Sequence, residues 1–471
     1  MSARILQTLD RKPLTLKSST IYTPLAYAVE RDKIARRVAS MKKKLSLGLA
    51  ILAAFGLAIS AMPQATAATK SIKIGLLFPT TGPMALLGTD QSVGAEMVLK
   101  WANTKGGIKG IPIEIFKADS KSSPAEGATA AQRLIDQNGV QIIIGSYSSG
   151  IAAAIAPVAQ RNDVILWEVG AVSPAVNSQR YSNFLRTVGV SATYAAADYD
   201  FTVNFLAKKL GKPAKELRIA IANNDGAFAT SVGDAVNSLF KKKGLKIVAK
   251  EVYPVTSTDL TPTVLKLKAA APDILFLTPD ANDALLFWQT AQQQNFDVDA
   301  LVGSSGIGGA GFVAKFGAAG VEGVYDVEAP ALATMSTDTL EPTVAALTKE
   351  WVKAFAASEG HPCAVHCGDG IGGAYTLVTD VLPRALVLKN TTLTSKGIIA
   401  AAMRTNIKEG GTPQGFGVKF SNTSKATPGE NERAQSVIMQ WQGGSLKVVW
   451  PANLASSTPA APMVTWAKRS K

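Results

Sequence analysis

The 471-residue chain has only two cysteines and two histidines, and all four lie between His361 and Cys367. A serine hydrolase needs a histidine to activate its nucleophile, so we expect no hydrolase in the rest of the chain. The segment Gly303 to Gly311 is rich in glycine but has no P-loop lysine, which argues against a nucleotide site. Charged residues are also few, at 18% against 47% apolar residues, which is typical of a globular chain.

The positive charge of the chain is unevenly distributed. The formal net charge is +14, but residues 1–67 hold 11 of the basic residues and 3 acids. The basic excess is therefore mostly N-terminal, and we predict no nucleic-acid partner.

The N-terminal region has the three parts of a secretory signal peptide. Met41 to Lys44 is basic, Leu45 to Ala61 is apolar, and Ala65 to Ala67 is a small-residue cleavage site. We expect cleavage near Ala67, with 41–67 as the signal peptide and 1–40 as an over-called extension. An uncleaved anchor is the alternative, although the apolar run is short for a bilayer span. The mature protein is therefore expected in the periplasm.

Strands and helices alternate along the mature chain in two series. The first has apolar strands at Ile72 to Phe78, Ile111 to Asp119, Ile142 to Ile144 and Val164 to Val169, and the second begins after a helix at Tyr194 to Leu210. Such alternation predicts parallel sheets with helices on both faces. Two α/β lobes would leave a ligand cleft between them, beyond the carboxyl ends of the strands.

The stretch Gln141 to Gly150 predicts an anion site in the first lobe. A short apolar strand stops at Gly145, and the serines that follow lead into a helix. Free N–H groups of a first helical turn, with serine hydroxyls, can hold a carboxylate without a cationic side chain. The alternative is an ordinary turn with a serine N-cap.

Four motifs follow one another in order along the first lobe. They are Ile72 to Gly75 with Thr81 to Pro83, Asn103 to Gly110, Ile142 to Gly145 with paired serines, and Phe184 to Thr187. From about Ser71 to Trp450 the chain resembles the branched-chain amino-acid-binding type of periplasmic solute-binding protein. The resemblance implies two Rossmann-like lobes joined by a three-stranded hinge, a receptor function for an ABC importer, and no enzyme activity.

The resemblance also implies where the lobes begin and end. The expected crossings between lobes are Thr187 to Ser191, Tyr325 to Pro330 and Gly411 to Val418. The first lobe would then be 68–188 with 329–412, and the second 189–328 with 413–450. Residues 451–471 are rich in Ala, Ser, Thr and Pro, so we expect a poorly ordered tail.

The family's ligand contacts fall on two loops of the first lobe. By resemblance, the residues that hold the ligand carboxylate and its surroundings are Tyr147, Ser148, Ser149, Gly170, Ala171 and Val172. Val172 stands where the family has a threonine, so one hydroxyl is lost. In the second lobe, Phe228 stands in place of a tyrosine, and Ser305 in place of the acid that pairs with the ligand's ammonium group.

A serine cannot supply the missing charge, and this raises two hypotheses for the ligand. An unpaired ammonium in a closed cleft costs several kcal/mol. Either Glu168 or Asp280 replaces the acid, or the ligand has a carboxylate and no amine. For Glu168, a hinge or backbone hydrogen-bond role is the alternative.

Aromatic side chains near the expected site favour the second hypothesis. Tyr147, Trp167 and Phe228 suit an aromatic or apolar acid, although Trp167 and Phe228 are equally compatible with core packing. Leu87 and Phe78 are weaker candidates, chosen by position alone.

The Cys/His cluster from His361 to Cys367 allows three interpretations. Thiolate and imidazole are zinc ligands, but no second ligand pair exists elsewhere in the chain. Because an exported protein is in an oxidising compartment, we favour a disulfide between Cys363 and Cys367 over a metal site or free thiols.

Together these observations predict an exported binding protein that acts as a monomer without a cofactor. Its ligand would be a small carboxylate-bearing solute, and its partner an inner-membrane ABC permease. The alternatives are a branched-chain amino-acid carrier that uses Glu168 or Asp280 for the ammonium group, and a ligand-sensing regulator subunit of the same fold.

Overall fold

The computed structural model describes residues 70–388, 393–422 and 428–469. The chain divides into a unit of residues 1–67 and a unit of residues 68–471. The expected extension and signal peptide therefore lie outside the described residues. Within the described ranges, no helix is both long and apolar enough to cross a membrane.

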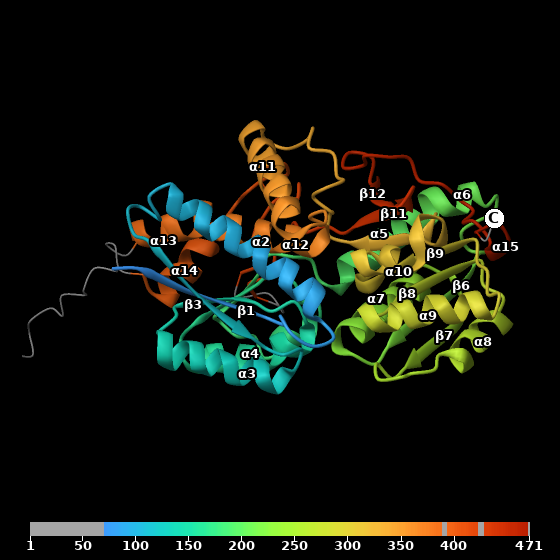
Figure 1. Cartoon of the computed structure of the whole chain (residues 1–471), viewed down its shortest axis with the longest axis horizontal. Coiled ribbons are helices and arrows are strands. Elements are labelled where there is room, and N and C mark those ends of the chain that lie inside the picture. The colour runs from blue at the N-terminus through green and yellow to red at the C-terminus, as the bar shows by residue number, and fades with distance from the viewer. Residues whose placement is uncertain (1–69, 389–392, 423–427, 470–471) are drawn as a thin grey trace, which may run out of the picture. The chain divides into compact units, whose positions relative to one another are not determined.

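The first sheet is parallel and lies in the N-terminal part of the described chain (Figure 1). Its strand order is β2-β1-β3-β4-β5. The strands are β1 (Ile72–Phe78), β2 (Ile113–Asp119), β3 (Ile142–Gly145), β4 (Ile165–Glu168) and β5 (Phe184–Arg186). The accompanying helices are α2 (Ala85–Thr104), α3 (Pro124–Arg133), η1 (Leu134–Asn138), α4 (Ser149–Arg161), η2 (Pro174–Asn177), α11 (Pro342–Glu359), α12 (Val365–Thr376), η5 (Leu377–Val381), α13 (Leu382–Leu388) and α14 (Ser395–Ala402).

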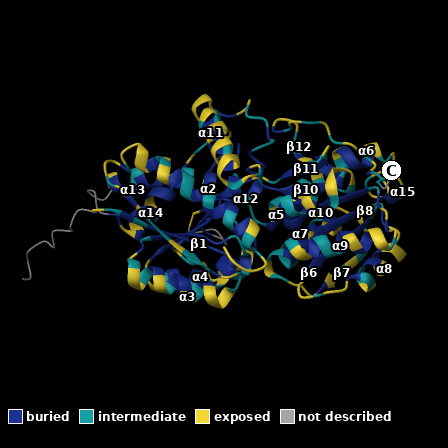
Figure 2. Ribbon diagram, viewed as in Figure 1, coloured by how far each residue is buried: buried dark blue, intermediate teal, exposed yellow. Residues whose placement is uncertain are grey.

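The alternation of side chains along β3 explains why helices cover both faces of this sheet. Ile142 and Ile144 are buried in the same cluster as Val98 of α2, whereas Ile143 points the other way and is buried with Ile155 of α4. A strand that is apolar on both faces must be covered on both faces. In Figure 2 the inner strands of the sheet are accordingly buried, and exposed residues lie on the outer surfaces of the helices and in loops.

The second sheet has seven strands in the order β12-β11-β10-β9-β8-β6-β7. They are β6 (Arg218–Asn224), β7 (Lys246–Tyr253), β8 (Ile274–Thr278), β9 (Ala300–Gly303), β10 (Tyr325–Glu328), β11 (Val437–Gln442) and β12 (Ser445–Trp450). Its helices are α5 (Ser191–Phe201), η3 (Thr202–Leu206), α6 (Ala207–Lys209), α7 (Ala227–Lys242), α8 (Thr261–Ala269), α9 (Ala281–Gln293), η4 (Ser305–Ile307), α10 (Ala310–Val321) and α15 (Trp466–Arg469). Strands β6 to β10 pair in parallel, and β11 and β12 are antiparallel. The expected α/β class with two helix-flanked sheets is confirmed.

The third crossing between the sheets lies later in the chain than expected. The backbone N–H of Arg186 in β5 donates to Gly429 (2.8 Å), and the N–H of Asn431 donates to Arg186 (3.0 Å). Arg186 also forms a buried ion pair with Glu430 at 2.6 Å. The chain therefore stays beside the first sheet through Asn431 and joins the second at Val437, so the expected crossing at Gly411 to Val418 needs correction.

The C-terminal segment is packed against the second sheet's helices, contrary to the expected poorly ordered tail. The Trp466 ring lies 4.5 Å from that of Trp288, and its Nε1 donates to the Phe296 carbonyl at 2.9 Å. Met463 is buried and donates its N–H to the Asp299 carbonyl at 2.7 Å. The polar composition of the segment concealed two large apolar anchors.

We predict that Trp466→Ala lowers the free energy of unfolding by about 3 kcal/mol, because it removes a buried ring and its hydrogen bond. The measurement is urea denaturation of the mature chain. Lys468→Ala, an exposed position two residues further on, is the matched control and should have no effect. Equal midpoints for the two variants would contradict packing of this segment.

Candidate ligand-binding site

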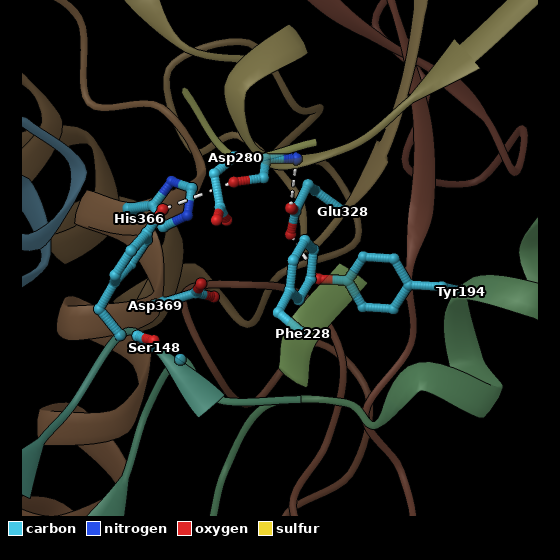
Figure 3. Close-up of a pocket in the computed structure, with 10 residues that line it drawn as sticks. Ser148, Tyr194, Phe228, Asp280, Glu328, His366 and Asp369 are labelled. Atoms are coloured by element: carbon cyan, nitrogen blue, oxygen red, sulfur yellow. Dashed lines mark hydrogen bonds between the residues drawn. The ribbon is translucent and has the colours of Figure 1, made fainter. Parts of the chain in front are cut away.

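A pocket lies where loops of the two sheets meet, beyond the carboxyl ends of their strands (Figure 3). Its lining combines aromatic rings, hydroxyl groups and carboxylates from distant parts of the chain. The lining residues are Tyr147, Ser148, Gly170, Tyr194, Phe228, Asp280, Ser305, Glu328, His366 and Asp369. This is the position at which open parallel sheets bind small molecules.

The wall next to the first sheet is built on the turn between β3 and α4. Ser148 is the N-cap residue of α4, and Tyr147 before it has a φ of 73°, in the left-handed region that non-glycine residues rarely adopt. Gly170 lies against the same turn, and a Cβ there would meet the Tyr147 Cα at 2.8 Å. Glycine is therefore required where these two loops approach each other.

Glu328 at the end of β10 organises the opposite wall. Its Oε1 accepts the N–H of Ser305 at 2.8 Å, and its Oε2 accepts the Tyr194 hydroxyl at 2.5 Å. The Tyr147 hydroxyl lies 3.5 Å from the Ser305 hydroxyl, which joins the two walls. Ser305 also has a positive φ, of 52°, so both residues of this bridge have unusual backbone conformations.

The electrostatic character of the pocket comes from three carboxyl groups. Burial raises the pKa of Asp280 to about 6, with Asp283 adding to the effect, and raises the pKa of Glu328 to about 7. Burial also raises the pKa of Asp369, which accepts a hydrogen bond from Gln414 at 2.6 Å. Each of these groups resists ionisation when no cation is near.

No lining residue of the pocket carries a positive charge at neutral pH. The one candidate is His366, and burial lowers its pKa to about 4, so its ring is neutral. That ring packs on Tyr147 at a centroid distance of 5.1 Å. The pocket is therefore rich in hydrogen-bond acceptors and suited to a ligand that brings positive charge or N–H donors.

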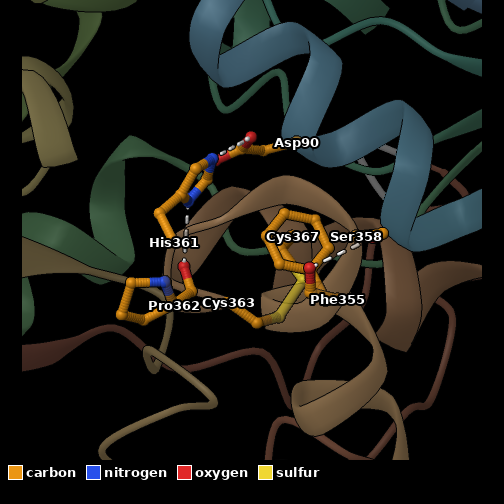
Figure 4. The surroundings of a disulfide bond; sticks show 7 residues. All are labelled: Asp90, Phe355, Ser358, His361, Pro362, Cys363 and Cys367. Carbon is orange, nitrogen blue, oxygen red and sulfur yellow. Dashed lines mark hydrogen bonds and ion pairs between the residues drawn. A yellow bond between two sulfur atoms is a disulfide. The ribbon is translucent and has the colours of Figure 1, made fainter.

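The Cys/His cluster contributes to this site through α12. The structure joins Cys363 to Cys367 in a disulfide, across the start of α12 (Figure 4). His366 lies inside this loop, and His361 lies 3.4 Å from the Asp90 carboxylate of α2. Among the residues that the structure describes, no group of three or more His, Cys, Asp or Glu is arranged to hold a metal ion.

Six of the thirteen residues expected from the sequence line the pocket. They are Tyr147, Ser148, Gly170, Phe228, Asp280 and Ser305. Leu87 lines a smaller adjoining cavity. The structure places the others outside the pocket lining: Ser149, Trp167, Glu168, Ala171, Val172 and Phe78.

The residues outside the lining have structural partners instead. The Ser149 hydroxyl accepts the Ser173 N–H at 3.1 Å, and the Trp167 ring packs on Phe420 and donates to the Gly373 carbonyl. Both side chains are buried, so their structural contacts account for these residues.

Glu168 has the backbone role that was the alternative to ammonium binding. Its Oε1 accepts N–H groups from Ser146, Gly170 and Ala171, each at 2.8 Å. A fourth N–H, that of Val169, lies at 3.1 Å, and the side chain is fully buried. The carboxylate thus holds together the two loops that form the first wall.

Sequence reasoning missed four lining residues: Tyr194, Glu328, His366 and Asp369. Glu328 was within reach, because it ends a strand that was expected to cross between lobes. His366 and Asp369 were noticed only as part of the Cys/His cluster and its helix. Nothing in the local sequence indicates that α12 turns these side chains towards loops more than 200 residues earlier.

Comparison with known proteins assigns the fold to a family. A family model described as periplasmic binding protein matches residues 71–444. A Leu/Ile/Val-binding protein homolog 7 from Brucella abortus is 31% identical over 412 residues, covering 85% of this chain and 97% of the relative. A homolog 8 from Brucella suis is 31% identical over 411 residues, covering 86% and 97%.

Solved structures have the same fold. The branched-chain amino acid substrate-binding protein LivJ from Streptococcus pneumoniae, in complex with isoleucine, has a TM-score of 0.66 and 21% identity, covering 84% of this chain and all of that one. An ABC transporter solute-binding protein from Rhodopseudomonas palustris, in complex with 3,4-dihydroxybenzoic acid, has a TM-score of 0.62 and 19% identity, covering 85% and 99%.

The chain belongs to the periplasmic binding protein family. Members of this family are extracytoplasmic solute-binding proteins, and the chain is a ligand-binding receptor of this family.

We predict that Glu328 makes the unliganded protein less stable at high pH. Its pKa is about 7 in the folded protein and about 4.3 in an unfolded chain. The folded state thus holds the proton more tightly than the unfolded chain. The resulting contribution to the free energy of unfolding is present at low pH and is lost as the pH rises through about 7. Between pH 5.5 and pH 8.0 the free energy of unfolding of the wild type should fall by on the order of 2 kcal/mol more than that of Glu328→Gln. Urea denaturation at the two pH values is the measurement, and parallel losses in both proteins would contradict the raised pKa.

Proposed function

We propose that the chain is the solute receptor of an ABC importer and that its lobes close on a small solute carrying an ammonium group. The observation that supports this is the presence of three carboxyl groups, Asp280, Glu328 and Asp369, around a pocket whose lining has no cationic side chain. An ammonium group would let these carboxyls ionise, and each would gain a charge-assisted hydrogen bond.

This proposal favours one of the two sequence-based hypotheses over the other. Asp280 lines the pocket and is the better partner for the ammonium group, because the Glu168 carboxylate is occupied by backbone N–H groups. A ligand with a carboxylate and no amine would bring a negative charge close to Asp280 and Glu328, whose pKa values of about 6 and 7 leave them mostly and partly ionised at neutral pH. Repulsion and desolvation both oppose that outcome.

A carboxylate can still be accommodated when an ammonium group accompanies it. Ser148 offers a hydroxyl at the N-terminus of α4, where a helix attracts negative charge. An amino acid presents both groups, and the curated relatives have names that refer to leucine, isoleucine and valine. We therefore favour an amino acid or a related amine over an aromatic acid.

In the cell, the proposed receptor would act outside the cytoplasm. A signal peptide at 41–67 would export the chain to the periplasm, where it would act as a monomer without enzyme activity and deliver its solute to a membrane permease. Ligand binding would favour the closed form of the lobes, which is the form that a permease distinguishes.

A thermal-shift screen of the mature chain tests this function. The ligands are straight-chain and branched amino acids, primary amines, and the corresponding aliphatic and aromatic acids without an amine. Amino acids or amines should raise the melting temperature, because they bind only the folded state. Stabilisation by the acids alone would overturn the proposal.

We expect Asp280→Asn to weaken amine binding by about 30-fold or more, because it removes one partner of a desolvated charge pair. Calorimetric titration at pH 8 with the best amine from the screen is the measurement. Asp259→Asn, a change at an exposed carboxylate of the same lobe, is the control. Equal losses in both variants would show that Asp280 does not contact the ligand.

A further inference from the structure

A second, apolar cavity lies near the ligand pocket but shares no lining residue with it, and we call it the side cavity. Its walls come from the start of α10, the segment after β10, the disulfide loop and the turn between β11 and β12. The lining residues are Gly308, Ala310, Val313, Ala331, Ala333, Thr334, Pro362, Ala364, Trp441, Gly444, Ser445 and Leu446. Most of these side chains are apolar, and no charged residue is among them.

A narrow neck lies between the pocket and the side cavity. The neck shares Ser305, Glu328 and His366 with the pocket. It shares four small residues with the side cavity, and these are Gly308, Ala310, Pro362 and Ala364. The three spaces therefore follow one another through common walls.

The volumes indicate which part of a solute each space can take. The pocket has about 30 Å³ and the neck about 20 Å³, whereas the side cavity has about 140 Å³. An apolar cavity of roughly 150 Å³ is large enough for a benzene molecule. With the lobes in this arrangement, the pocket has room for a small polar head group only. A larger apolar part of a solute fits in the side cavity.

We propose that the side cavity is a subsite for an unbranched apolar tail of the solute whose head group lies in the pocket. The inference rests on the proposed function, because it takes an ammonium group among Asp280, Glu328 and Asp369 as its starting point. The substrate class is then a primary amine or amino acid with a tail of about four or more carbons. The residues that the neck shares with the side cavity include Gly308, Ala310 and Ala364, whose small side chains limit the steric cost of a methylene chain there.

Carboxyl groups also line the neck, and burial disfavours their charged forms. Asp326 is fully buried at the neck, and burial raises its pKa well above the usual value. Asp90, the other neck carboxyl besides Glu328, has its pKa raised to about 6 by burial and faces His361 at 3.4 Å. Burial disfavours the charged forms of Asp326 and Asp90, and this lowers the cost of placing a methylene chain beside them.

Two ligand series test the inference by calorimetric titration of the mature chain. One runs from ethylamine to hexylamine, and the other from alanine to 2-aminooctanoic acid. Once the tail reaches the side cavity, affinity should rise about threefold to fourfold for each added methylene group. Affinity that is flat or falls with length, while short amines still bind, would overturn the subsite and leave the proposed function intact. If no amine of either series binds, both are overturned.

Two variants locate the effect. Ala333→Leu fills the side cavity from the segment after β10, and Ala310→Leu narrows the neck from α10. Each should flatten the series, so that the affinity ratio between hexylamine and ethylamine falls about tenfold or more. Ala357→Leu, at an exposed position of α11, is the control and should keep the wild-type ratio. Unchanged ratios in both folded variants would place the tail elsewhere and overturn the inference.

Discussion

The fully buried carboxylate of Glu168 is the interaction on which the first wall of the binding site depends. One oxygen accepts four backbone N–H groups from two loops, those of Ser146 and of Val169 to Ala171. Several hydrogen bonds to one carboxylate stabilise its charged form and compensate for its burial. Arg186 extends the network by donating to the Ala171 carbonyl and pairing with Glu430. The positions of Ser148 and Gly170 in the pocket are thereby set by a carboxyl group that lies outside the pocket lining.

The other carboxyls of the cleft are in the opposite situation. Glu328 accepts two hydrogen bonds, and Asp280 and Asp369 lie with it around one small space. Burial raises their pKa values, and the neutral His366 offers no compensation. Burial disfavours the ionised form of each acid in the empty protein, and a bound cation would favour it. Burying these carboxyl groups costs folding free energy, and the same groups are available to bind a cation. Such a cost is common at binding sites.

Much of the fold could be predicted from the sequence, because strand alternation and helix periodicity are local signals. The strand at Ile72–Phe78 is an example. The site was harder, because His366 and Asp369 reach it through long-range packing of α12, and only the structure contains that packing. Composition also misled at the C-terminus, where Trp466 outweighs its polar neighbours. The serine at position 305 was noticed, but the nearby Glu328 was not, because the two residues are 23 positions apart and meet only through a hydrogen bond in the folded chain.

On this account, the cleft recognises a cation through carboxyl groups that are partly protonated when no ligand is bound. The most direct test is to titrate the tightest-binding primary amine at pH 6.5 by calorimetry, in buffers with different ionisation enthalpies. The pKa of Glu328 is about 7 in the empty protein, and an adjacent ammonium group should lower it. Binding should therefore release protons to the buffer. Proton uptake, or heats that do not depend on the buffer, would contradict the account.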